Sequence, residues 1–141
     1  MPPLKIYDLF ISHAWKYGDD YQRLINLLDD APLFYYRNYS APKYKPLHIG
    51  GDEVHNASEI ELAITRKIRP VNCVLIISGM YYNNRKWMQF EIDSAKNLEK
   101  PIIAIRPRGA ERTPIEVQDA ADTIVSWNTS SIVNAIRQYS I

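Results

Sequence analysis

The residues with the clearest chemical potential are Trp87 and Glu91, which are four positions apart. If residues 86–99 form a helix, these two side chains lie on one face, one turn apart, and Ser94 and Ala95 continue that face. A carboxylate beside a large aromatic ring near a helix start would be partly desolvated, which penalises its charged form and suits it to acid–base or ion-stabilising work. The alternative is a rim carboxylate that interacts with the helix N-terminus through the macrodipole.

Two polar segments follow predicted strands and are rich in hydroxyls, amides and aromatic rings. The first contains Ser12, His13 and Trp15, and the second contains Ser78 and Tyr81. Such a mixture can stack a base and form hydrogen bonds with a ribose or a phosphate. The alternative is ordinary turn chemistry, because Ser, Gly and Asn commonly follow strands.

Other chemistries find little support in the sequence. The pair Gly50–Gly51 lacks the lysine and the spacing of a phosphate-binding loop, and no GxSxG segment is present. The single cysteine, Cys73, lies inside the apolar run 71–77, which indicates a buried hydrophobic residue and not a nucleophile. The three histidines have no metal-ligand spacing, so we expect neither a metal nor a cofactor. They are His13, His48 and His55.

Short apolar runs alternate along the chain with amphipathic stretches. Strands are predicted at residues 7–12, 34–39, 72–78, 101–105 and 123–127. Helices are predicted at residues 19–30, 58–68, 86–99, 113–122 and 130–139. This alternation predicts a three-layer, flavodoxin-like α/β fold with a five-stranded parallel sheet in the order 2-1-3-4-5 and helices on both faces. Ligands of such sheets bind at the carboxyl ends of strands 1 and 3, where the two polar segments would meet.

Length and composition indicate an ordinary globular protein with one domain, residues 1–141. The net charge of +1 argues against nucleic acid as a partner. No apolar stretch approaches the ~20 residues that span a bilayer, and residues 1–7 lack the apolar core of a signal peptide, so we expect a cytoplasmic protein without membrane contact. The 10 tyrosines favour either a ligand- or partner-binding surface or simply strand formation.

Three segments carry a resemblance to a known family. Residues 7–13 (YDLFISH) resemble the opening strand of TIR domains, and residues 100–105 (KPIIAI) resemble a later strand of the same family. Between them, Ser78, Tyr81, Trp87 and Glu91 follow one another in the family's order. The chain fits this pattern from residue 4 to residue 141. It is most similar to the TIR-like subgroup that includes ThsB of the bacterial Thoeris antiphage system.

The resemblance implies an activity. Many TIR domains cleave NAD at the nicotinamide–ribose bond with a glutamate at the position of Glu91, so NAD would be a substrate. ThsB-like members respond to phage by making a cyclic ADP-ribose-type signal, and this diffusible nucleotide activates an effector protein. Residues 42–55 correspond to a family loop that shapes the pocket and mediates assembly, which implies self-association through TIR surfaces.

The roles implied for single residues follow from that reaction. Glu91 would stabilise the positive charge that develops on the ribose carbon. The residues expected to contact the base, the nicotinamide or the sugar phosphate are Phe10, Ser12, His13, Trp15, Ser78, Tyr81 and Trp87. Two alternatives stay open: a non-catalytic interaction or scaffolding module, and a nucleotide-binding or nucleic-acid-processing relative on the same fold.

Overall fold

The computed structural model describes residues 5–12, 20–39, 64–77, 85–106 and 115–141. The strands are β1 (Ile6–Ser12), β2 (Tyr35–Asn38), β3 (Cys73–Ile77), β4 (Ile102–Arg106) and β5 (Thr123–Ser126). The helices are α1 (Asp20–Asp29), α3 (Arg85–Asn97), α4 (Ile115–Ala120) and α5 (Thr129–Tyr139), and residues 64–68 are also helical. Each predicted strand and helix therefore has an observed counterpart among these residues. The bounds differ by a few positions at most, apart from residues 58–63, which lie outside the described part.

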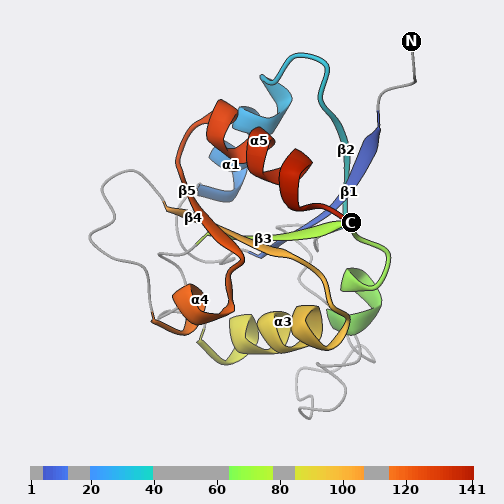
Figure 1. Ribbon diagram of the computed structural model, residues 1–141, viewed down its shortest axis with the longest axis vertical. Helices are drawn as coiled ribbons and strands as arrows, with labels where there is room; N and C mark the ends of the chain where they lie inside the picture. Colours follow the sequence, from blue (N-terminus) through green and yellow to red (C-terminus); the bar gives the residue numbers. More distant parts are fainter. Residues whose placement is uncertain (1–4, 13–19, 40–63, 78–84, 107–114) are drawn as a thin grey trace.

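The five strands form one parallel sheet in the order β2-β1-β3-β4-β5, as predicted. Helices α1 and α5 cover one face of this sheet, and α3 and α4 cover the other (Figure 1). The three-layer α/β architecture follows from the alternation of strands and helices, because each crossover between parallel strands places a helix on one face. No helix within the described ranges has both the length and the apolar character that crossing a bilayer requires.

The centre of the core is β3, whose 5 residues are all buried. Helices cover both of its faces, which explains why its sequence is uniformly apolar and does not alternate. The amphipathic helices supply the rest of the core through their apolar stripes. Leu24 and Leu28 of α1, and Ile64 and Ile68 on the other side of the sheet, are each 0% exposed.

Helix α3 ends earlier than the predicted residue 99. Glu99 has a φ of 56°, in the left-handed region, and stops the helix. The Lys100 amide donates to the Ala95 carbonyl at 2.8 Å, and the Glu99 amide donates to the Lys96 carbonyl at 3.1 Å. These two hydrogen bonds form a Schellman motif, in which the left-handed residue is usually glycine. Because this chain has a glutamate at that position, the sequence alone does not indicate where the helix ends.

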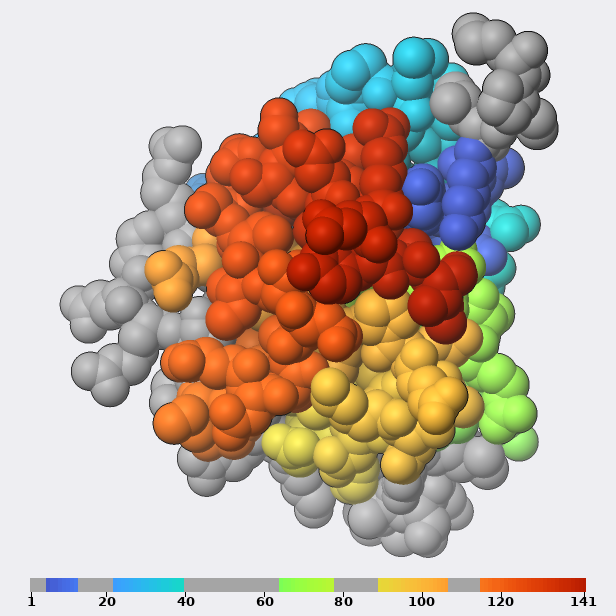
Figure 2. All heavy atoms as spheres, viewed as in Figure 1, coloured from blue at the N-terminus to red at the C-terminus, as the bar shows by residue number. Residues whose placement is uncertain are grey.

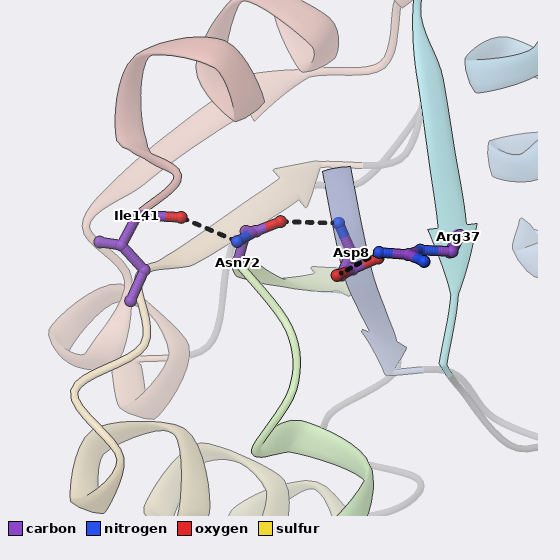
Figure 3. Close-up of polar contacts among 4 residues, drawn as sticks. All are labelled: Asp8, Arg37, Asn72 and Ile141. Atoms are coloured by element: carbon purple, nitrogen blue, oxygen red, sulfur yellow. Dashed lines mark hydrogen bonds and ion pairs between the residues drawn. The ribbon is translucent and has the colours of Figure 1, made fainter. Parts of the chain in front are cut away.

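A polar network joins three distant parts of the chain at Asn72 (Figure 3). The Asp8 amide of β1 donates to Asn72 Oδ1 at 2.8 Å, and Asn72 Nδ2 donates to the Ile141 carbonyl at 2.8 Å. The Asp8 carboxylate also accepts two hydrogen bonds from Arg37 of β2, at 2.5 and 3.0 Å. Asp8, part of the segment that resembles the family, therefore has a structural role between neighbouring strands in this protein.

We expect Asn72→Ala to lower the free energy of unfolding by about 2 kcal/mol. The substitution leaves the Asp8 amide without its acceptor and the Ile141 carbonyl without its donor. Urea denaturation at pH 7 measures this loss. Arg37→Gln serves as the comparison and should cost less, because the Arg37 side chain is 63% exposed and exposed ion pairs contribute little. A larger loss for Arg37→Gln than for Asn72→Ala would contradict the assigned importance of Asn72.

Cys73 is the first residue of β3 and is 0% exposed. Desolvation by burial raises the pKa of its thiol from 9.0 to about 12. The thiol donates to the carbonyl of Val74 at 3.8 Å. The prediction that Cys73 is a buried hydrophobic residue is confirmed.

The raised pKa predicts a loss of stability at alkaline pH. Above pH 9 the unfolded chain releases the Cys73 proton while the folded chain retains it, so the free energy of unfolding falls as the pH rises. Between pH 8 and 10.5 the wild type should lose about 2 kcal/mol more than Cys73→Ala. Denaturant unfolding of both proteins across this range measures the difference. Parallel pH profiles would show that the thiol does not titrate as described.

Candidate functional site

The carboxyl ends of β1 and β3 meet at one edge of the sheet. These strands are parallel neighbours, with Leu9 opposite Cys73 and Ser12 opposite Ile76. The chain order changes direction between them, because β2 lies on one side of β1 while β3 and β4 continue on the other. This is the switch point at which parallel α/β sheets bind ligands.

Three buried side chains of the described residues are polar or charged, whereas the remaining buried side chains are apolar. These three are Ser12, Glu91 and Ser94, with exposures of 1%, 3% and 2%. Burial of polar groups costs free energy unless they are hydrogen-bonded, so such residues are retained where they have a structural or functional use. Their positions in the fold are therefore the first guide to a site.

Ser12 is the last residue of β1 and lies at the switch point. Its Oγ atom has no hydrogen-bond partner among the residues that the structure describes. An unpaired buried hydroxyl costs about 1–3 kcal/mol. A ligand group that forms a hydrogen bond with this hydroxyl would remove that cost.

Glu91 lies in the interior of α3, on the same helical face as Ser94 and Ala95. The first turn of α3 contains no acidic residue, so the alternative of a carboxylate at the helix N-terminus is wrong. Because Glu91 is only 3% exposed, its side chain lies within the protein and not in bulk solvent. The helix face that carries it is the face that packs onto the molecule.

A pair of hydroxyls anchors this face of α3. Ser94 Oγ and Thr65 Oγ1 are 3.1 Å apart, and either can donate the hydrogen bond. Thr65 belongs to the helical residues 64–68, so the bond joins two helices on the same side of the sheet. The sequence spacing predicts that Ser94 lies on the Glu91 face, but it does not identify Thr65, because a single threonine in an amphipathic helix gives no distinctive signal.

The direction of α3 follows from its connections. The helix comes after β3 ends at the carboxyl edge, and it leads into β4, which starts at the opposite edge. Its first half therefore lies nearer the carboxyl edges of β1 and β3 than its second half does (Figure 1). Glu91 is near the middle of this helix.

Of the other residues predicted to bind substrate, the structure describes the side chain of Phe10 alone. Phe10 is 2% exposed, pairs with Val74 and belongs to the hydrophobic core, so a stacking role would require its ring to be uncovered. Trp87 lies in α3, but its side chain is outside the described part. The remaining predicted residues, His13, Trp15, Ser78 and Tyr81, also lie outside the described residues, as do residues 42–55. Their assigned contacts remain predictions.

Within the described ranges, no group of three or more His, Cys, Asp or Glu side chains is arranged to hold a metal ion. The chemistry available there consists of one buried carboxylate and two buried hydroxyls. A carboxylate can stabilise developing positive charge, and hydroxyls can position a sugar.

Comparison with known proteins identifies the family to which the chain belongs. A family model described as the TIR-like domain of the Thoeris protein ThsB matches residues 10–112, which include the end of β1 and all of β3, α3 and β4. No curated protein matches the chain. The matched range includes Ser12, Glu91 and Ser94 and covers well over half of the sequence. The chain therefore belongs to the ThsB TIR-like domain family of the Thoeris antiphage defence.

Proposed function

We propose that this protein cleaves NAD at the nicotinamide–ribose bond and that Glu91 is the catalytic carboxylate. The observation that supports this most directly is the burial of Glu91, which is 3% exposed on the packed face of α3. A carboxylate removed from water interacts more strongly with a developing positive charge than an exposed one does. Membership of the Thoeris family agrees with a role in signalling after phage infection.

The reaction needs only one carboxylate. When the bond between the ribose carbon and the nicotinamide nitrogen breaks, its electron pair goes to nicotinamide, which leaves as a neutral molecule without protonation. The ribose carbon becomes oxocarbenium-like, and Glu91 stabilises that charge and orients the sugar. A second acidic residue acting as a general acid is therefore not required.

The product depends on which nucleophile captures the ribose carbon. Attack by water gives linear ADP-ribose and releases a proton to solvent, whereas attack by a nitrogen of the adenine ring of the same molecule gives a cyclic product. Exclusion of water from the site favours the cyclic product. We propose that the cyclic product is the signal that activates a separate effector, and that residues 42–55 contribute to closing the site.

Ser12 is proposed to position the substrate. Its Oγ is buried at the switch point and has no partner among the described residues. A ribose hydroxyl or a phosphate oxygen would form a hydrogen bond with this hydroxyl. Substrate binding would then remove the free-energy penalty of the unpaired buried group. This role is separate from that of Glu91, because it requires no charge.

Replacing Glu91 with glutamine should reduce nicotinamide release from NAD by at least about 100-fold, because the amide has a similar shape but cannot balance the ribose charge. Chromatographic measurement of nicotinamide after incubation with NAD tests this. Glu99→Gln is the matched control, since this residue follows the end of the same helix and is exposed. We expect it to retain the wild-type rate.

Equal rates for wild type and Glu91→Gln would remove the catalytic role and favour the non-catalytic interaction module. Thermal unfolding of the variant provides the necessary check on folding, because Glu91 is buried. Only a variant that remains folded informs on the chemistry. Glu91→Asp offers a second test, because it keeps the charge while shortening the side chain.

Replacing Ser12 with alanine should weaken the binding of NAD without lowering the stability of the folded protein. Because the hydroxyl has no described partner, its removal should leave the free energy of unfolding unchanged or slightly raised. The KM for NAD should nevertheless increase by about fivefold to 20-fold, which corresponds to the loss of one hydrogen bond to the substrate. Steady-state kinetics and denaturant unfolding of the same preparation measure both quantities. A destabilised variant with an unchanged KM would show that Ser12 is structural.

A further inference from the structure

A hollow lies at the amino edge of β1 and β2, opposite the carboxyl edge where the candidate NAD site is. Its volume is about 340 Å³, and it is lined by Lys5, Tyr7, Pro32, Leu33 and Arg137. The start of β1, the segment before β2 and α5, drawn in blue, cyan and red, come together on one face of the molecule (Figure 2). The proposed chemistry of NAD makes no use of these residues.

An aromatic column forms the wall beside this hollow. The rings of Tyr7 and Phe34 stack with centroids 5.5 Å apart, and Phe34 stacks on Tyr36 at 5.8 Å. Two cations lie over the rings: Lys5 Nζ is 5.1 Å from the Tyr7 centroid, and the Arg137 guanidinium carbon is 5.7 Å from that of Phe34. The ring faces attract and hold these cations, so both charges are positioned in advance.

The charge of the hollow is one-sided. No acidic residue of the described part of the chain lines it, and neither Lys5 nor Arg137 forms an ion pair with a carboxylate from that part. Arg137 donates one hydrogen bond, from Nη2 to the Leu33 carbonyl at 3.2 Å. Its planar guanidinium has five N–H donors in total, so donors remain for an anion. The electrostatic complement of this surface is a carboxylate or another anion.

Leu33 adds an apolar component to the rim of the hollow. Its φ is 55°, in the left-handed region, and its side chain is 66% exposed. This backbone conformation costs a non-glycine residue roughly 1–2 kcal/mol. Burial in the core does not offset that cost, because the side chain points to the surface. Strained residues of this kind cluster at active sites, ligand-binding sites and switch regions.

We propose that this hollow binds an acidic segment of a protein partner. The segment places an aspartate or glutamate carboxylate between Lys5 and Arg137 and an apolar neighbour against Leu33. The lining leaves the hollow open to solvent, which suits one side chain of a docked polypeptide better than a small molecule that must be mostly enclosed. Because it lies at the opposite edge of the sheet, the partner can bind while the NAD site is occupied.

The experiment uses the full chain labelled with ¹⁵N and a capped six-residue peptide of alternating leucine and glutamate. The matched probe is the same peptide with glutamine in place of glutamate. Titration should shift the amide signals of Leu33 and Arg137, with a dissociation constant on the order of 1 mM or lower. The glutamine peptide should bind at least about fivefold more weakly, and raising the salt concentration should weaken the glutamate peptide.

Lys5→Gln and Arg137→Lys each should weaken the glutamate peptide by about threefold or more, the second because lysine lacks the planar donor fork. Arg66→Gln is the matched control, an exposed arginine of residues 64–68, on the other side of the sheet, and it should have no effect. The amide spectrum of each variant reports whether the fold is retained. Nicotinamide release measured in parallel should not change, which separates this proposal from that of the NAD site.

Three results would overturn the proposal. Equal binding of the glutamine peptide would show that the hollow does not recognise a carboxylate. Inorganic phosphate that binds as tightly as the glutamate peptide, with the same dependence on Lys5 and Arg137, would indicate a site for phosphate ligands in place of a protein segment. The absence of shifts at Leu33 and Arg137 at millimolar peptide would show that the hollow does not bind acidic segments.

Discussion

The parallel pairing of β1 with β3 is the constraint on which the rest of the structure depends. It holds Leu9–Ser12 against Cys73–Ile76 at the centre of the sheet, where helices cover both faces. Because the two strands run in the same direction, their carboxyl ends reach the same edge, and the chain order reverses there. The position of Ser12 and the starting direction of α3 both follow from this pairing. The candidate site is therefore a consequence of strand order more than of any local motif.

Much of the fold could be predicted because its physical signals are local. The apolar run at β3 and the stripe that includes Ile64 and Ile68 indicate burial by themselves. The end of α3 could not be predicted, because Glu99 adopts a conformation that usually needs glycine. The site was only partly predictable: spacing placed Glu91 and Ser94 on one face, but the contact of Ser94 with Thr65 requires knowing which helices pack together.

The positions of the polar residues inside the protein help to distinguish residues with a structural role from candidate site residues. The described core is apolar except at Ser12, Glu91 and Ser94, and these residues are confined to the end of β1 and to one face of α3. A core selected for stability alone would place apolar side chains there, since buried polar groups are costly. Asp8 shows the opposite case: it lies in a family-like segment, yet its amide and carboxylate are both occupied by structural partners. A motif residue is therefore not automatically a site residue.

The uniformly apolar character of β3 has a consequence for the unfolded chain. Cys73–Ile77 is a run without charge, proline or glycine and with high strand propensity, which is the type of segment that pairs with identical copies in aggregates. In the folded protein, β1 and β4 occupy both of its hydrogen-bonding edges. Refolding at high protein concentration thus becomes a competition between these two neighbours and other molecules, and losses of global stability translate into lower soluble yield.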